Sequence, residues 1–211
     1  MKPQVTVIDY GMGNLLSVCR ALEHIGAAVT LSSDPSIIRQ AQRLLLPGVG
    51  AFADGMAELG QRKLIAPIQQ CANADVPLLG ICLGAQMLLD ASEEFGQHRG
   101  LGFIGGDVRA IPTTDTSGQP IKVPHVGWAD LHSDHHHPLL SGLPVDSAVY
   151  FVHSYQCHLQ DSNDLISHCD VGGHQLTAII GRDNISGCQF HPEKSGPVGL
   201  QILRNFLEQS T

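Results

Sequence analysis

The sequence predicts an α/β fold with a mostly parallel central sheet, helices on both of its faces and an antiparallel extension. In the first half of the chain, short apolar runs punctuated by glycine alternate with segments of helical spacing. That order is typical of a parallel sheet covered on both faces. In the second half, apolar runs follow one another with turn-like breaks and little helix between them, which favours partly antiparallel strands. The length of 211 residues predicts one domain, residues 1–211.

Four continuous apolar runs in the first half are typical of buried parallel strands. Helical spacing predicts a helix through Leu15, Val18, Cys19 and Leu22, a long helix over 52–74, and a helix over 83–95. Leu200, Leu203, Phe206 and Leu207 share a face of a C-terminal helix over 199–208, which should pack on the sheet. The predicted strands lie at 5–9, 28–31, 43–48 and 76–82, then within 106–112, 122–132, 147–159, 175–181 and 186–193, with a surface loop at 113–120.

The charge and the termini limit the classes of partner. The formal net charge is −8 and no Lys/Arg cluster is present, which argues against nucleic acid or an anionic membrane as a partner. Pro3 and Asp9 interrupt any apolar signal core, and no run reaches spanning length. We therefore expect a cytosolic (cytoplasmic) protein whose partners are small molecules or proteins.

Six cysteines are spread over the chain without a CxxC motif, so we expect free thiols rather than disulfides. Cys82 differs from the others because it lies in Gly80-Ile81-Cys82-Leu83-Gly84, between an apolar run and a segment of helical spacing. This G-x-nucleophile-x-G form is typical of a nucleophile elbow. A helix start there would favour the thiolate. The alternative is a buried cysteine beside two packing glycines.

A thiolate nucleophile needs a base, and the base needs an orienting group. The sequence QFHPEKSG supplies both, because Pro192 biases His191 toward extended backbone and residues two apart then face the same way. His191 is thus the candidate base and Glu193 the candidate orienting carboxylate.

Two backbone N–H groups could form an oxyanion hole. Residues 47–50, PGVG, follow the strand at 43–48, and the N–H of Val49 could act together with that of Leu83. A simple tight turn is the alternative for 47–50.

Two other motifs are weak. Residues 11–16, GMGNLL, begin like a dinucleotide fingerprint, but Leu16 stands where the third glycine belongs. The histidine-rich residues 132–138 could chelate a metal, but no Cys or Glu motif accompanies them, which favours a solvated loop. The chemistry proposed needs no metal and no cofactor.

Taken together, PGVGAF, GICLGAQMLL and QFHPEKSG, in that order, resemble the class I (triad) glutamine amidotransferases. Within that family, DYGMGN, GLGFIGGDV, PHVGW and FVHSY are similar to the glutaminase subunits of imidazole glycerol phosphate synthase, and the match spans nearly the whole chain. The resemblance implies a flavodoxin-like fold and hydrolysis of L-glutamine to glutamate and ammonia by Cys82, His191 and Glu193. It also implies glutamine binding by Gly50, Gln86, Ser154 and Tyr155.

The resemblance further implies a heterodimer with a separate (β/α)₈ barrel cyclase, which uses the ammonia in histidine biosynthesis. Asn14, Trp128 and Lys194 are the implied contact residues. Three residues depart from the family pattern and bear on docking rather than on the triad. Ala129 stands where asparagine is usual, Gln156 replaces a frequent tyrosine, and Gly105 sits where proline is common.

Other functions remain open at this point. The same chemistry could serve an anthranilate, aminodeoxychorismate or pyridoxal phosphate synthase, against which PHVGW and HPEKSG weigh. A non-catalytic regulatory module of the same fold is disfavoured by the intact Cys, His and Glu set. A cysteine peptidase or esterase would share the elbow, but nothing in the sequence indicates a peptide cleft.

Overall fold

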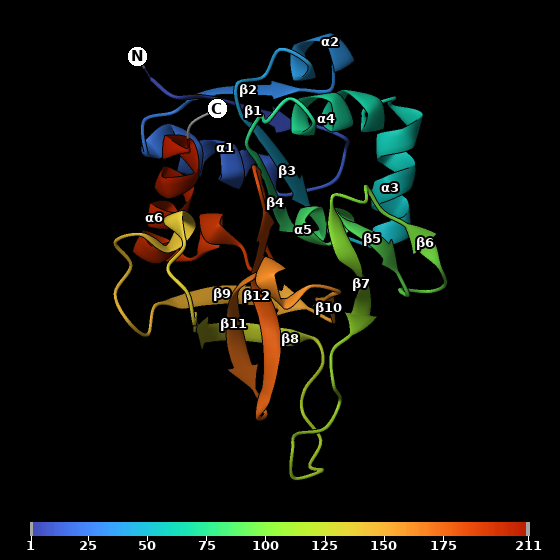
Figure 1. The fold of residues 1–211 in the computed structure, drawn as a ribbon, viewed down its shortest axis with the longest axis vertical. Helices are drawn as coiled ribbons and strands as arrows, with labels where there is room; N and C mark the ends of the chain where they lie inside the picture. Colours follow the sequence, from blue (N-terminus) through green and yellow to red (C-terminus); the bar gives the residue numbers. More distant parts are fainter. Residues whose placement is uncertain (1, 210–211) are drawn as a thin grey trace.

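A seven-stranded sheet forms the centre of the molecule in a computed structural model that describes residues 2–209 (Figure 1). Its order is β11-β12-β13-β4-β3-β1-β2, and neighbouring strands from β2 to β13 pair in parallel. The two remaining strands pair antiparallel, so the predicted fold class is confirmed. The strands are β1 (Gln4–Ile8), β2 (Ala28–Ser32), β3 (Leu44–Gly48), β4 (Leu78–Cys82), β11 (Leu165–Val171), β12 (His174–Arg182) and β13 (Ile185–Cys188).

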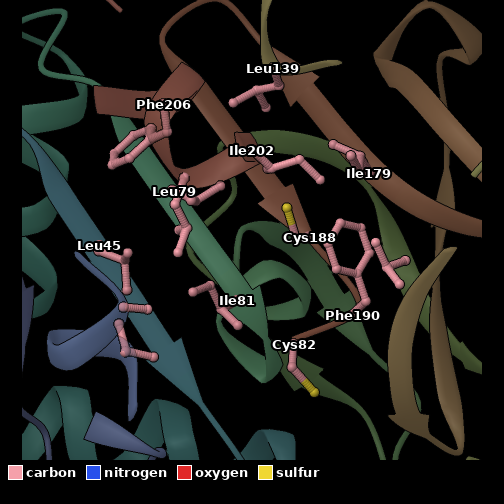
Figure 2. Packing of buried hydrophobic residues seen from close by; sticks show 14 of the residues in the cluster. Leu45, Leu79, Ile81, Cys82, Leu139, Ile179, Cys188, Phe190, Ile202 and Phe206 are labelled. Atoms are coloured by element: carbon pink, nitrogen blue, oxygen red, sulfur yellow. The ribbon is translucent and has the colours of Figure 1, made fainter. Parts of the chain in front are cut away.

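Helices cover both faces of this sheet. On one face, α1 (Leu15–His24) and α6 (Gly196–Glu208) bury Leu22, Ile202 and Phe206 against strand residues such as Leu45 and Leu79 (Figure 2). The other face is covered by α2 (Pro35–Ile38), α3 (Phe52–Gln61), α4 (Ile65–Ala72) and α5 (Leu83–Met87). Because both faces are buried, the parallel strands are apolar throughout rather than alternating.

The antiparallel extension consists of two smaller sheets. One has the order β10-β7-β5-β6, and the other is a ribbon of β8 paired with β9. Short 3₁₀ helices connect several of these strands. The bounds are β5 (Leu89–Ser92), β6 (His98–Arg99), β7 (Ile104–Ala110), β8 (His125–Asp130), β9 (Ala148–His153), β10 (Tyr155–Leu159), η1 (Pro138–Leu140), η2 (Ser162–Asp164) and η3 (Pro192–Lys194).

The predicted long helix over 52–74 is two helices, α3 and α4. Lys63 lies between them with φ 59°, a left-handed conformation that ends a helix. The prediction of one helix over 83–95 is also wrong, since α5 ends at Met87 and β5 begins at Leu89. Backbone N–H groups of Leu101 and Phe103 bond to the carbonyls of Met87 and Leu88, so tertiary pairing replaces further helical turns.

The segment 147–159 is also not a single strand, because it changes sheets at Ser154. Residues before that point pair with β8, and residues after it pair with β7. β11 was not predicted, because polar Ser167, His168 and Asp170 interrupt its apolar pattern. Within residues 2–209, no helix is long and apolar enough to cross a membrane.

The strand order predicts a ligand site at one edge of the central sheet. The chain runs from β1 outward to β2 and then crosses to β3 on the other side of β1, so the strand order reverses there. In open parallel sheets, ligands bind beyond the carboxyl ends of the strands near such a reversal. Gly48 and Cys82, which end β3 and β4, lie opposite each other in register at that edge.

Candidate active site

Cys82 ends β4 and immediately precedes α5. Its backbone has φ 54° and ψ −109°, a conformation that few residues other than glycine adopt. Such strain costs about 1–3 kcal/mol and persists where the surrounding structure enforces it, often at functional sites. Figure 2 shows Cys82 beyond Ile81, with its sulfur directed away from the packed apolar side chains. The chain therefore makes the strand, sharp turn and helix that an exposed nucleophile requires.

Three glycines around this turn are needed for close approach rather than for a positive φ. A Cβ at Gly84 would overlap the carbonyl group of Leu46. At Gly80 it would lie 2.6 Å from the backbone nitrogen of Ala85, and at Gly48 it would lie 2.9 Å from that of Gly84. Side chains at these positions would thus push the elbow away from β3 and from its own helix, and the glycines allow the strained turn to be packed tightly.

His191 and Glu193 form a buried pair. Nδ1 of His191 lies 2.9 Å from Oε1 of Glu193, and the two side chains are 2% and 1% exposed. A carboxylate can only accept, so Nδ1 carries the proton of this hydrogen bond. Nε2 is then the ring nitrogen available for chemistry, which is the orientation that a general base needs.

The backbone of His191 is held from two sides. Its N–H donates to the carbonyl of Tyr150 in β9 at 3.0 Å. The hydroxyl of Ser195 donates to the His191 carbonyl at 2.7 Å and accepts from the N–H of Tyr150 at 3.0 Å. The imidazole is thus attached to both η3 and β9, which limits its movement relative to the sheet edge.

The electrostatics of His191 depend on its neighbours. Burial by itself lowers the pKa of His191, but hydrogen bonding and charge attraction from Cys82 and Glu193 outweigh burial and raise the pKa to about 9. Nε2 makes no hydrogen bond of regular geometry within residues 2–209. Cys82 and His191 line the same cavity. At neutral pH the raised pKa of His191 favours an imidazolium.

The other five cysteines lack such surroundings. All six cysteines are free, in agreement with the sequence prediction. Burial raises the pKa of Cys157 to about 12 and that of Cys188 further still. Burial likewise raises the pKa of Cys19, Cys71 and Cys169. These thiols remain protonated and unreactive at neutral pH.

A cavity of about 430 Å³ opens over Cys82 and His191. Its volume is suited to a small metabolite. Every predicted site residue apart from Glu193 and the three expected contact residues lies on its wall. Glu193 lies behind His191, as an orienting group should. The lining residues are Val49, Gly50, Cys82, Leu83, Gln86, Glu94, Pro124, Val152, His153, Ser154, Tyr155 and His191.

The two predicted oxyanion donors are the N–H groups of Val49 and Leu83, which belong to different segments of the chain. Leu83 begins α5, where backbone N–H groups have no acceptor within the helix. Val49 is 42% exposed and precedes Gly50, whose φ of 108° only glycine adopts readily. The 47–50 turn therefore has the conformational freedom that a backbone ligand site uses.

Two glutamine side chains and one backbone carbonyl form a hydrogen-bonded line, of which Gln86 and Tyr155 lie on the cavity wall. Nε2 of Gln86 lies 3.1 Å from the Tyr155 carbonyl and 3.0 Å from Oε1 of Gln189. Nε2 of Gln189 lies 3.9 Å from the Cys82 sulfur. The sequence reading missed Gln189, although it precedes His191 by two residues and extended spacing places both on one face.

Glu94 is a second residue that the sequence reading missed. Its Oε2 accepts from the backbone N–H of Phe52 at 2.7 Å, at the start of α3, and its side chain also lines the cavity. It thereby supplies a carboxylate to the wall of the cavity. No motif contains Glu94, and the helix predicted over 83–95 gave no reason to place this residue at a cavity.

The predicted contact residues lie outside this cavity, and two of them meet at Tyr150. The Trp128 ring, 58% exposed, packs edge-on against Tyr150 with ring centroids 5.9 Å apart. Nζ of Lys194 lies 6.0 Å from the centroid of the same ring, within cation–π range. We call Trp128, Tyr150 and Lys194 the Tyr150 cluster. Asn14 immediately precedes α1.

A second, larger cavity of about 550 Å³ borders the histidine-rich residues 132–137. Its wall includes His168, and Nε2 of His132 lies 3.8 Å from Oδ2 of Asp170 nearby. Among residues 2–209, no group of three His, Cys, Asp or Glu side chains has a geometry that could hold a metal ion. Cys82 and His191 line the smaller cavity, and neither lines the larger one.

The three departures from the family pattern are accommodated locally. Ala129 is partly buried against the apolar cluster of the α1 and α6 face. Oε1 of Gln156 accepts from the N–H of Thr177 at 3.2 Å, which ties β10 to β12. A Cβ at Gly105 would lie 3.0 Å from Oε1 of Gln160, a flexible side chain that could move.

Comparison with known proteins gives a consistent result. The family model described as glutamine amidotransferase class-I matches residues 6–210. The protein of Legionella pneumophila (strain Lens) named imidazole glycerol phosphate synthase subunit HisH 1 is 48% identical over 209 residues, 97% of this chain and 98% of its own. The subunit HisH of Methylococcus capsulatus is 47% identical over 208 residues, 96% of this chain and 95% of its own.

Solved structures support the fold. PurLQS from Thermotoga maritima superposes with a TM-score of 0.73 at 21% identity, covering 98% of both chains. A crystal structure titled glutamine amidotransferase gives a TM-score of 0.73 at 17% identity, covering 97% of both chains.

Proposed function

Because the chain belongs to the class I glutamine amidotransferases, and among them to the glutaminase subunits of imidazole glycerol phosphate synthase, we propose that Cys82, His191 and Glu193 catalyse its reaction. The protein is an enzyme that hydrolyses the side-chain amide of glutamine. The observation that carries the assignment of the triad is the buried His191–Glu193 pair beside a cysteine held in a strained turn at the mouth of a cavity.

Acylation uses the thiolate and imidazolium pair. The Cys82 sulfur attacks the amide carbon of glutamine, and the carbonyl electrons move to oxygen. Nε2 of His191 then gives its proton to the leaving nitrogen, the carbon–nitrogen bond breaks, and ammonia departs from a thioester. Glu193 holds the ring through Nδ1 and stabilises its positive charge before the proton leaves.

Hydrolysis of the thioester reverses these roles. Neutral His191 takes a proton from water at Nε2, and the resulting hydroxide attacks the thioester carbon. The carbon–sulfur bond breaks and the thiolate returns beside an imidazolium, while the new carboxylic acid gives its proton to solvent or to the released ammonia and leaves as glutamate. Both steps pass through an oxyanion, for which the N–H groups of Val49 and Leu83 are the proposed donors. Each such donor typically contributes about 3 kcal/mol to the transition state.

The cavity wall supplies groups for the rest of the substrate. Gly50, Gln86, Ser154 and Tyr155 are the proposed contacts for glutamine. The Glu94 carboxylate suits the α-ammonium group, since opposite charges attract strongly in a partly enclosed site.

The chain acts together with a partner subunit of the synthase, as the names of its relatives state. We propose that this partner is a (β/α)₈ barrel cyclase that forms a heterodimer with this chain and uses its ammonia in histidine biosynthesis. The exposed Tyr150 cluster, with Asn14, is the proposed contact surface. The cytosolic location expected from the sequence stays a prediction.

Replacing Cys82 with Ala in the complex with the cyclase tests the assignment. We expect glutamine-dependent synthesis to vanish and synthesis from added ammonium salt to persist, because the cyclase does not need the thiol. Retained glutamine-dependent synthesis would exclude Cys82 as the nucleophile. Loss of both activities from a folded complex would contradict the division of labour between the subunits.

A further inference from the structure

Gln189 lies beside the nucleophile because of strand register. Cys188 of β13 pairs with Ile81 of β4, so the next residue on each strand, Gln189 and Cys82, lie side by side at the sheet edge. Gln189 is 1% exposed, and its backbone N–H donates to the Ala178 carbonyl at 2.8 Å. Its side chain is therefore placed by the central sheet and not by a loop.

The orientation of the Gln189 amide follows from a single carbonyl. The Tyr155 carbonyl can only accept, so the Gln86 group 3.1 Å from it must be the NH₂. The second hydrogen of that NH₂ needs an acceptor, and Oε1 of Gln189 lies 3.0 Å away. The remaining end of the Gln189 amide is then its NH₂, which faces the Cys82 sulfur at 3.9 Å.

A histidine fixes the same carbonyl from its other side. Nδ1 of His153 lies 2.8 Å from the Tyr155 carbonyl and must donate to it. Nε2 of His153 then accepts from Nδ1 of His125 at 3.2 Å. Burial lowers the pKa of His153 to about 4, so the ring is neutral at pH 7 and this tautomer is maintained. The carbonyl thus receives two donors from β9 and α5, and its position is well defined.

We propose that Gln189 positions and stabilises the Cys82 thiolate through an N–H donor, and that the Tyr155 carbonyl sets the direction of that donor through Gln86. An amide in the opposite orientation would present an oxygen to the sulfur and repel its negative charge. The 3.9 Å distance is long for a hydrogen bond, and catalytic contacts of this kind commonly shorten when the substrate complex forms. The inference rests on the proposed role of Cys82.

Gln189→Met tests the donor, because methionine has a similar shape and no N–H. We expect kcat for glutamine hydrolysis in the complex to fall about tenfold, as for the loss of a hydrogen bond to a charged group, with KM changed less than about twofold. The pH–rate profile for alkylation of Cys82 by iodoacetamide should shift upward by about one pH unit, because the thiolate is less stabilised. A purely structural role would not move that profile.

Gln189→Glu provides a second variant, which keeps an acceptor for Gln86 but places a carboxylate toward the sulfur. Its upward shift of the alkylation profile should exceed that of Gln189→Met. Gln175→Met is the matched control, since Gln175 is exposed on β12, and its profile should equal that of the wild type. Thermal unfolding of each variant identifies any loss of fold.

An alkylation profile unchanged in folded Gln189→Met or Gln189→Glu overturns the inference. If Cys82→Ala is inactive at the same time, the proposed nucleophile stands and the donor role of Gln189 alone fails. If Cys82→Ala remains active with glutamine, the assignment of the nucleophile fails first.

Discussion

The histidine-rich cavity and the cavity over Cys82 differ in how their polar side chains are held. The larger one borders the histidine-rich residues 132–137, most of which are exposed on a loop. The smaller one has Cys82 at the end of β4 and His191 just beyond the end of β13, and Glu193 is buried behind His191. Neither volume nor the number of ionisable groups distinguishes the proposed active site. Fixed orientation of its groups does, because transition-state stabilisation depends on groups already in place.

Removing one histidine from each cavity should give the largest difference between the two. His191→Asn should lower kcat for glutamine hydrolysis by about 10⁴-fold, because the proton has no other carrier at the thioester. His136→Asn, on the exposed loop, should leave kcat within about twofold. Steady-state glutaminase assays of the complex measure both, and comparable losses in the two variants would show that the larger cavity takes part in the reaction.

Adding one methyl group to a glycine near each cavity should have a smaller effect, which is on the free energy of unfolding. Gly84→Ala should destabilise the fold by about 3 kcal/mol, since the new Cβ would overlap the Leu46 carbonyl and β3 would have to move. Gly142→Ala, beside the histidine cavity, meets no atom within 4 Å but has φ 73°, which costs about 1 kcal/mol. Urea unfolding of the two variants checks the order, and equal losses would mean that the elbow is not tightly packed.

The histidines of the two cavities should also differ in their effect on the pH dependence of stability. The folded pKa of His191 is raised from 6.5 to about 9, so its contribution is fully present below pH 6.5 and is lost as pH rises through 9. The loss is at most about 3 kcal/mol. Urea unfolding between pH 6 and 10 measures it, and His191→Asn should flatten the slope while His136→Asn should not. An unchanged slope in His191→Asn would contradict a charged His191.

Much of the fold could be predicted because the first half of the chain follows simple rules. The runs at 5–9, 28–31, 43–48 and 76–82 are buried on both faces, so continuous apolar sequence and short length mark them as strands. The same rule failed at α5 and β5, where both elements are apolar and periodicity cannot separate helix from strand. There, bonds from Leu101 and Phe103 to α5 and the residue after it decide the outcome, and these partners are distant in sequence.

The residues of the candidate site could be predicted only where they lie a few positions apart in the sequence. His191 and Glu193 could be paired from their two-residue separation, and the elbow from its glycines. Gln189 and His153 lie in QFHPEKSG and FVHSY, but their roles depend on the β13 register and on the break at Ser154, which local spacing does not show. Glu94 lies in no motif, and its position depends on contact with Phe52. Each of the three acts through partners that the fold brings together.

The fully engaged Tyr155 carbonyl has a consequence for the product. Both of its lone pairs already receive donors, and the neighbouring Ser154 carbonyl accepts from the N–H of Ile111 at 3.0 Å. A freed ammonia molecule therefore finds no open lone pair on the Tyr155 oxygen, and this carbonyl has little capacity to retain it.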